Sequence, residues 1–437
     1  MFSTSLNLLS QQNLTAEKDG DPMKNQTASP QLSICIPTHH GRAELLCELL
    51  ESIRLQIDDD IINNIQICIS DNGSQDDTET MVKWYMRTYQ NLNITYFRFS
   101  SNEGLRNFQN VISMAKAHHF WMIGSDDIVP PNSIGKVLHI ISHNPTVSGI
   151  TVNKLNFDFE YSGLKGSDHP IVLPHKASSP GHWQDYPSIV SNLCFLFCFI
   201  SSHIINKNEW DKGFNKVGYQ KFEEMRHFAY TAMLSEVARI SPNWIWVPEY
   251  LITQRMGNQS VVQEVGSVEN ALQCTEDMTN YSKLIIAGAS EYPGLAARLR
   301  RNIFLMYWNP LEILKYKADN PFRSSYDLVM LKRCLVWFSR EPLFWATSMP
   351  ILLTPGFMCT FLRWSRNKIF RMKIGTVDYD KRVATSFIRK LILQIMSTKT
   401  KDPDQQLSSL KPLENEILTY VALIRKQKRY NELSGGI

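Results

Sequence analysis

The chain has 437 residues, 43% of them apolar and 20% charged, which is enough for one or two globular domains with a large core. A net charge of only +4, with no strongly basic run in the first 300 positions, argues against a nucleic-acid-binding protein. The eight cysteines form no C-x-x-C pair, and several lie inside apolar segments. We therefore expect reduced, buried thiols and a cytoplasmic protein.

The N-terminal segment 1–30 is rich in Gln, Asn, Ser and Thr and has no cationic stretch followed by an apolar run. This composition predicts a disordered leader and does not resemble a signal peptide.

Residues 32–141 predict a strand followed by a helix, four times in succession. The buried, β-prone segments are 32–37, 65–70, 94–99 and 120–123, and the helical apolar stripes fall at 45–53, 81–85, 106–116 and 134–141. Crossovers of this length are typical of right-handed βαβ units. The pattern therefore predicts an α/β fold with a mostly parallel central sheet flanked by helices. A dinucleotide-binding domain is disfavoured, because the loop after the first strand reads PTHHGRAE and lacks the G-x-G-x-x-G pattern.

Acidic side chains follow two of these strands. Asp71 ends the second strand, and Asp126 and Asp127 follow the fourth. The carboxyl ends of parallel strands meet at one edge, where carboxylates often hold a divalent cation and, through it, phosphate oxygens. A simpler interpretation stays open, in which Asp126 or Asp127 caps the helix that begins near Asn132. Likewise, Ser74 and Asp77 have the spacing of a capping box, although this leaves Asp71 unexplained.

Four motifs, in this order, resemble those of family 2 glycosyltransferases. They are Pro37-Thr38, Asp71-Asn72-Gly73-Ser74, Asn102-x-Gly104 with Asn107, and Gly124-Ser125-Asp126-Asp127. The resemblance covers residues 31–145 and extends more weakly to residue 262. It implies a GT-A fold, with a nucleotide-sugar-binding part at 31–145 and an acceptor-binding part at 146–262. The commoner family pattern has Asp at the position of Gly124. Glycine at this position resembles the abequosyltransferase-like subgroup that builds bacterial O-antigen.

The resemblance implies transfer of one sugar from a nucleotide-diphosphate donor to a saccharide acceptor. Negative charge grows on the diphosphate as the glycosidic bond breaks, and Mg²⁺ or Mn²⁺ would neutralise it. By resemblance, Asp126 is the direct metal ligand and Asp127 makes a water-mediated or ribose contact. Asp71 would bind the base ring, and Pro37 and Thr38 would meet the base through backbone groups.

Further donor-site residues follow from the same motifs. Asn72, Gly73, Asn107 and Ser125 would lie beside the nucleotide. Arg42 or Arg106 would reach the ribose or a phosphate, unless either is simply an exposed helix arginine.

Transfer with inversion also needs a base that deprotonates the acceptor hydroxyl. The resemblance points to the acidic pair Glu223 and Glu224, in a segment expected to be helical. Adjacent residues on a helix point about 100° apart, so only one of them can face the cleft. The alternative is that both face solvent. The apolar run 194–202 predicts a core strand or strand pair that forms the wall of the acceptor site.

The last part of the chain, 263–437, predicts a helical region. Its segment 342–362 has no charged residue but contains three prolines, and a cluster of Lys and Arg follows at 363–373. This pattern favours a segment that lies on a membrane with anionic headgroups, at the inner face of the plasma membrane. A buried helical hairpin is the alternative. Either fits a lipid-linked acceptor. The polar tail from Lys399 predicts a mobile segment with one short helix at 414–428.

A different class of function also fits the sequence. The missing family carboxylate at Gly124 and the Glu-Glu pair would suit a non-catalytic GT-A-like protein that binds a nucleotide sugar or acts as a scaffold. A sugar-1-phosphate nucleotidyltransferase is disfavoured, because the glycine-rich signature after the first strand is absent.

Overall fold

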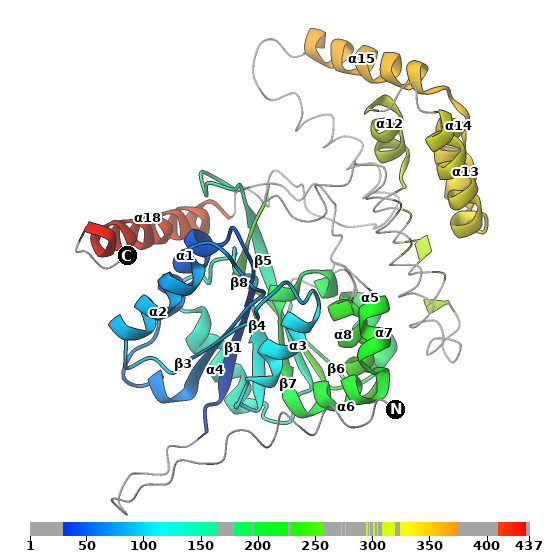
Figure 1. Cartoon of the computed structure of the whole chain (residues 1–437). Coiled ribbons are helices and arrows are strands. Elements are labelled where there is room, and N and C mark those ends of the chain that lie inside the picture. The colour runs from blue at the N-terminus through cyan, green and yellow to red at the C-terminus, as the bar shows by residue number, and fades with distance from the viewer. Residues whose placement is uncertain are drawn as a thin grey trace, which may run out of the picture.

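The computed structural model describes residues 29–164, 179–193, 196–225, 229–256, 308–319, 324–373 and 410–433, with a few single positions between 272 and 304. These residues form one sheet of eight strands in the order β3-β2-β1-β4-β7-β5-β8-β6 (Figure 1). The strands are β1 (Leu32–Thr38), β2 (Ile65–Asp71), β3 (Ile94–Arg98), β4 (His119–Met122), β5 (Gly149–Phe157), β6 (Gly181–Trp183), β7 (His203–Asn206) and β8 (Trp244–Arg255).

The first four strands are parallel to one another, as the strand–helix repeat predicts. β7 is antiparallel to both β4 and β5, β5 is parallel to β8, and β6 closes the edge antiparallel to β8. The helices that follow the strands are α1 (Ala43–Arg54), α2 (Thr78–Thr88), α3 (Arg106–Ser113), α4 (Ser133–His143), α5 (Tyr186–Leu193), α6 (Lys207–Val217), α7 (Tyr219–Glu224) and α8 (Ala229–Ile240). The predicted fold class is confirmed.

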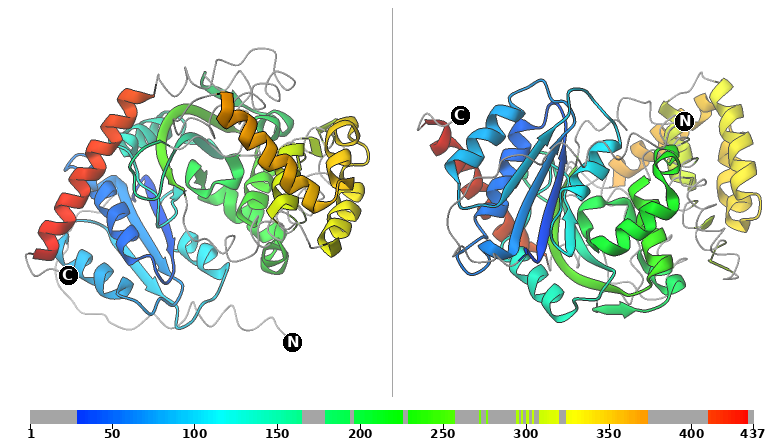
Figure 2. Two further views of the ribbon diagram at one scale, coloured as in Figure 1. Left: turned by 90° about the horizontal axis from the view of Figure 1, so that it is seen from above. Right: turned by 60° about the horizontal axis from the view of Figure 1, so that its bottom comes forward.

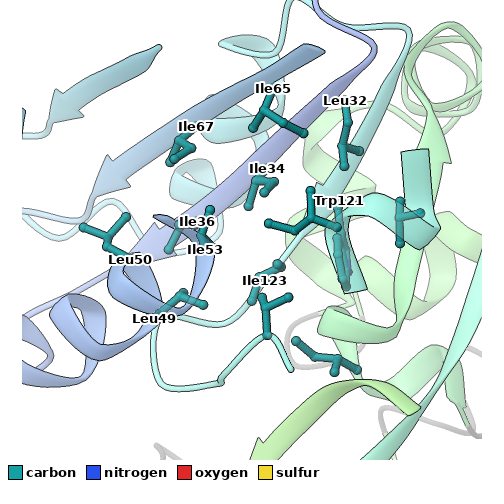
Figure 3. Packing of buried hydrophobic residues seen from close by; sticks show 14 of the residues in the cluster. Leu32, Ile34, Ile36, Leu49, Leu50, Ile53, Ile65, Ile67, Trp121 and Ile123 are labelled. Carbon is teal, nitrogen blue, oxygen red and sulfur yellow. The ribbon is translucent and has the colours of Figure 1, made fainter. Parts of the chain in front are cut away.

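The sheet has an apolar core on each face, because side chains alternate along each strand. Phe120 and Met122 of β4 contribute to the core beneath α3, α5, α6 and α8. Trp121 and Ile123 contribute to the opposite core, beneath α1, α2 and α4. Figure 3 shows this second core, in which Ile34 and Ile36 of β1 lie beside Leu49 and Ile53 of α1.

The C-terminal region is helical, as predicted. It contains α12 (Pro310–Asp319), α13 (Ser324–Phe338), α14 (Met349–Leu353) and α15 (Gly356–Lys373). The first three contribute to a separate apolar cluster around Trp308 and Phe338, and α15 packs against α12. Among the described residues, no single helix is long and apolar enough to cross a membrane. One pair, Phe344–Leu353 with Gly356–Trp364, reaches the length and composition together but is bent by 107°.

The last helix differs from its prediction. α18 spans Lys411–Leu433, longer than the expected 414–428, and packs on α1 instead of extending into solvent. Figures 1 and 2 show it along the α1 side of the sheet, away from α12–α15. The physical reason is its buried apolar stripe, Ile417, Val421 and Ile424, which the polar composition of the tail obscured.

Two other local predictions, and the alternative interpretation of the aspartate pair, are wrong. Segment 196–202 forms two 3₁₀ turns and not a strand. The Ser74–Asp77 capping box does not form, because the Ser74 hydroxyl donates to Asp71 and it is Asp76 that accepts from the Thr78 backbone N–H. Neither Asp126 nor Asp127 caps α4, whose N-cap is Asn132.

Parts of the predicted domain boundaries lie outside the described residues. These are residues 1–28 of the leader and the junction at 262–263. Six cysteines are described, and all except the half-buried Cys198 are buried.

Candidate active site

The loops that follow β1, β2, β3 and β4 meet at one edge of the sheet. Thr38 is the register partner of Asp71, and β4 lies on the other side of β1. The strand order therefore reverses between β1 and β4, and open α/β sheets bind ligands in the crevice at such a point. The side chains predicted for the donor site come from these loops, from the ends of β1 and β2 and from the first turn of α3.

The loops after β1 and β2 are joined by hydrogen bonds that backbone N–H groups donate. The Gly41 N–H donates to Asp76 Oδ2 at 2.6 Å, and the Asn72 N–H donates to the Thr38 carbonyl at 3.0 Å. The loop after β3 joins them through the Asn72 side chain, which donates to Asn102 Oδ1 and accepts from the Glu103 N–H, both at 2.7 Å.

Gly73 is required where these loops approach most closely. Its φ of +72° is left-handed, and a Cβ there would lie 2.6 Å from the Ser101 carbonyl carbon. The motif residues Asn72 and Gly73 thus shape the rim of the site.

Asp71 lies at this edge but is completely buried. One carboxylate oxygen accepts from the Ser74 N–H and hydroxyl at 2.9 and 2.5 Å, and the other accepts from the Tyr96 hydroxyl at 2.9 Å. Burial, together with the bond to Asp71, raises the pKa of Tyr96 well above its usual value. Asp71 therefore holds the β2–α2 loop in this structure, and its contact with a base stays a prediction.

Thr38 and Asn107 meet beneath the same loops. Asn107 Nδ2 donates to the Thr38 carbonyl at 3.1 Å. The Thr38 hydroxyl and the Asn107 amide oxygen are buried and have no hydrogen-bond partner among the described residues. Such atoms are uncommon in folded proteins and are often found where a ligand completes the pairing.

Asp126 and Asp127 face different surroundings. The Asp126 side chain is 25% exposed, and Arg42 Nη1 lies 3.1 Å from its Oδ2, across the point where the strand order reverses. Asp127 is 4% exposed; it accepts from the Ser201 hydroxyl at 2.5 Å and from the Arg255 N–H at 3.3 Å. Burial and the nearby charge of Asp126 raise the pKa of Asp127 well above that of an ordinary carboxyl.

Gly124 lies between the two carboxylates. A Cβ at this position would be 3.0 Å from Asp126 Oδ1 and 3.1 Å from Asp127 Oδ2, so both oxygens face the same point. Two converging carboxylate oxygens fit Mg²⁺ or Mn²⁺, which keeps several water or phosphate ligands. In the described part of the chain, no group of three His, Cys, Asp or Glu side chains is arranged to hold a metal.

Arg255, at the end of β8, holds the aspartate loop from behind. Its Nε donates to the Asp126 carbonyl at 2.9 Å, and its Nη2 donates to Glu48 Oε2 of α1 at 2.6 Å. Neither residue was predicted as a site residue. The available signals were the acidic Glu48 next to the apolar stripe of α1 and, for Arg255, its place in the weaker part of the family resemblance, which extends to residue 262.

Lys154 of β5 is a second cation that the sequence analysis did not identify. Its Nζ donates to Gln254 Oε1 and lies 4.4 Å from the centre of the Phe199 ring. Burial lowers the pKa of Lys154 to about 8, against the opposing charge of Asp127.

The two glutamates predicted as candidates for the catalytic base lie at the end of α7. Glu223 and Glu224 are both exposed, and they accept from the Tyr219 hydroxyl at 2.6 Å and from Gln220 Nε2 at 3.4 Å, respectively. Arg106 lies over the Tyr219 ring and pairs with Glu103 at 2.9 Å. Arg106 is thus an exposed helix arginine here, and it links α7 to the rim of the donor site. The roles of both glutamates stay predictions. Ser125 is buried, as is Pro37.

Residues 33–191 match the family model described as Glycosyl transferase family 2. The resemblance inferred from the motifs is thereby confirmed over this part of the chain, which is less than half of its length.

Two curated relatives agree with this class. The chain is 32% identical over 187 residues to "Abequosyltransferase RfbV" of Salmonella typhimurium, covering 41% of this chain and 54% of that protein. It is 32% identical over 121 residues to "Uncharacterized glycosyltransferase RT0329" of Rickettsia typhi, covering 28% of this chain and 35% of that protein. The matched region thus spans about half, or less, of the length of these relatives.

Solved structures give weaker likenesses. Residues 1–349 of TarS from S. aureus have 13% identity and a TM-score of 0.47, covering 68% of this chain and 82% of theirs. The mannosyltransferase PcManGT from Pyrobaculum calidifontis, solved with GDP-Man and Mn²⁺, has 14% identity and a TM-score of 0.46, covering 79% and 91%.

Proposed function

We propose that the protein is a glycosyltransferase that moves one sugar from a nucleotide-diphosphate sugar to a saccharide acceptor in the synthesis of a bacterial surface polysaccharide, such as O-antigen or capsule. The observation that carries this proposal is the convergence of Asp126 Oδ1 and Asp127 Oδ2 on one point at the crevice between β1 and β4. The family 2 domain and the similarity to a named abequosyltransferase support the class of reaction and pathway.

Mg²⁺ or Mn²⁺ would sit between the two carboxylates and supply positive charge to the departing diphosphate. Asp126 is the better direct ligand because it is more exposed, and Asp127 would act through water or the ribose. Arg42 holds the second oxygen of Asp126 and orients that carboxylate. Gly124 brings no side chain into the space near the two oxygens, where a Cβ would lie 3.0 and 3.1 Å from them.

The nucleotide would bind along the rim formed by Pro37, Thr38, Asp71, Asn72 and Gly73. The buried hydroxyl of Thr38 and the amide oxygen of Asn107 offer a donor and an acceptor without partners. For the base ring to reach Asp71, the ring would take the place of Tyr96 or Ser74 as a hydrogen-bond donor.

For the acceptor, Glu223 or Glu224 would remove the hydroxyl proton, with inversion of configuration. The position of α7 supports Glu223, because its partner Tyr219 contacts Arg106 at the rim of the donor site.

A lipid-linked acceptor at the inner face of the plasma membrane would fit the C-terminal helices. α14 and α15 expose large apolar side chains, and basic residues follow in the sequence at 363–373. The exposed residues are Leu353, Phe357, Met358, Phe361, Leu362 and Trp364. This combination is typical of helices that lie in the headgroup region of an anionic membrane.

The test is a thermal-shift screen of UDP-, GDP-, CDP- and dTDP-sugars with and without Mn²⁺. One donor with Mn²⁺ should raise the melting temperature by about 5 °C at saturating concentration. Asp126→Ala should abolish that shift, whereas Asp59→Ala, an exposed carboxylate in the loop after α1, should leave it unchanged. A shift that survives in Asp126→Ala would contradict the metal assignment. Binding without slow Mn²⁺-dependent donor hydrolysis would instead favour the non-catalytic, nucleotide-sugar-binding alternative.

A further inference from the structure

The C-terminal helix α18 packs against the back of the aspartate loop. Ile417, Val421 and Ile424 of α18 are buried in one apolar cluster with Ile128. Ile128 directly follows Asp127 in the chain, and its carbonyl accepts from the Thr253 N–H of β8 at 3.0 Å. Ile128, the residue that follows the aspartate pair, is thus enclosed between β8 and a helix almost 300 positions further along the chain.

A chain of charged hydrogen bonds joins α18 to the same loop. Arg425 Nε donates to Glu48 Oε1 at 3.0 Å, and the other oxygen of Glu48 accepts from Arg255 Nη2 at 2.6 Å. Arg255 in turn holds the carbonyl of Asp126 and, through its own N–H, the carboxylate of Asp127. The Arg255 side chain is only 2% exposed, so these charge-assisted bonds act where water competes little.

A third contact acts on the far end of the loop. The Tyr420 hydroxyl donates to the Ser52 carbonyl at 2.8 Å, and the Ser52 hydroxyl accepts from the Val129 N–H at 3.2 Å. Arg425 Nη1 also donates to the Glu160 carbonyl at 3.0 Å. α18 is therefore connected, through α1 and β8, to the aspartate pair and to the two residues that follow it.

We propose that α18 is a positioning element for the aspartate loop, and that Arg425, acting through Glu48 and Arg255, fixes where Asp126 and Asp127 lie. By linkage, occupation of the carboxylates stabilises the docking of α18 as much as docking favours occupation. The effect of α18 on the position of the loop follows from the contacts alone, whereas its effect on cation binding rests on the proposed function.

The experiment compares full-length wild type with Arg425→Ala, Arg425→Lys and Lys428→Ala. Lys428 makes the matched control, because it forms an ion pair across the same two helices with a different residue, Glu44, at 3.7 Å. Hydrogen exchange is followed by mass spectrometry in peptides covering 124–131 and 250–256. These peptides contain the hydrogen-bonded amides of Asp127, Val129, Thr253 and Arg255.

Arg425→Ala should speed exchange in both peptides about fivefold, the factor expected for one partly exposed charge-assisted hydrogen bond. Arg425→Lys, which keeps one donor for Glu48, should lie between Arg425→Ala and wild type, and Lys428→Ala should match wild type. Equal exchange in Arg425→Ala and wild type, or an equal rise in Lys428→Ala, would overturn the proposal.

A second measurement tests the effect of α18 on the proposed metal site. Free Mn²⁺ is measured by electron paramagnetic resonance in the presence of inorganic pyrophosphate as a diphosphate probe. Arg425→Ala should weaken Mn²⁺ binding about fivefold relative to Lys428→Ala. Unchanged affinity in a protein that binds Mn²⁺ would overturn the effect on the site. If wild type binds no Mn²⁺, the proposed metal function fails, and the exchange result still decides the role of α18.

Discussion

At the scale of single residues, the site depends on the contrast between Asp126 and Asp127. Asp126 is partly exposed and paired with Arg42, whereas Asp127 is buried against Ser201 and the backbone of Arg255. Two neighbouring carboxylates in such different surroundings are suited to different tasks. Under the proposed function, the exposed carboxylate would meet the ligand first, and the buried one would gain most when a cation replaces its proton.

The raised pKa of Asp127 predicts how Mn²⁺ binding depends on pH. Because the folded protein keeps this proton to a higher pH than the unfolded chain, the contribution of Asp127 to stability is greatest below the ordinary carboxyl pKa. That contribution is lost as pH rises through the raised pKa. A cation replaces the proton, so the stabilisation by Mn²⁺ and pyrophosphate should grow as pH rises from the ordinary carboxyl range through the raised pKa of Asp127.

Thermal denaturation with and without Mn²⁺ across this range measures the effect. Asp127→Asn, which cannot titrate, should flatten the dependence on pH. A larger Mn²⁺ shift at the acidic end would contradict the assignment of Asp127.

At the scale of elements, α1 is covered on both sides. Its periodicity predicts one apolar stripe facing the sheet, which includes Leu46, Leu49 and Ile53. The structure also buries Glu48 and Ser52, because α18 packs on the side that would otherwise face solvent. A polar residue buried on the outer side of a helix has no periodic signal of its own. This is why the contacts of α1 with α18 could not be predicted from the sequence of either helix.

The packing of α18 predicts a measurable share of stability. Ile424→Ala removes a fully buried side chain from the cluster with Ile128 and should lower the free energy of unfolding by about 2–3 kcal/mol. Leu423→Ala, which truncates a neighbouring side chain that is 49% exposed, should cost less than about 0.5 kcal/mol. Urea denaturation of the full-length protein compares the two. Equal losses would show that α18 does not pack as described.

At the scale of the whole molecule, the sheet and the helices α12–α15 have separate apolar cores. The outer faces of α14 and α15 expose several large apolar side chains, a density that is uncommon on the surface of a protein without a partner. The α12–α15 region and α18 lie on opposite sides of the sheet in both views of Figure 2. The proposed membrane contact and the proposed positioning helix are therefore independent features.

The exposed face of α15 predicts binding to anionic vesicles. Full-length protein should sediment with vesicles that contain phosphatidylglycerol, and less so at high salt, because both apolar insertion and the basic cluster contribute. Replacing both Phe357 and Phe361 by Ser should weaken binding about tenfold or more. Val336→Ser, at a side chain of α13 that is 79% exposed, serves as the control. Unchanged sedimentation of the double variant would exclude this face as the contact.

The sequence alone determined the strand–helix repeat, the parallel strands β1 to β4, the edge at which their loops meet, and the family resemblance of the motifs. These features are readable because each depends on residues within one βα unit, where periodicity, turn residues and chain order act locally. The aspartate pair belongs to this set, since the carboxyl end of a buried strand places its loop at the edge of the sheet.

Only the tertiary structure decided the insertion of β7 between β4 and β5, the burial of Asp71 beneath Tyr96, and the path from Arg425 through Glu48 and Arg255 to the aspartates. These contacts join residues that are up to 377 positions apart. A charged side chain in such a network looks like a surface residue in its own segment, because the partner that makes its burial favourable lies elsewhere in the chain. Local pattern therefore gives the edge of the site, and long-range charge pairing completes it.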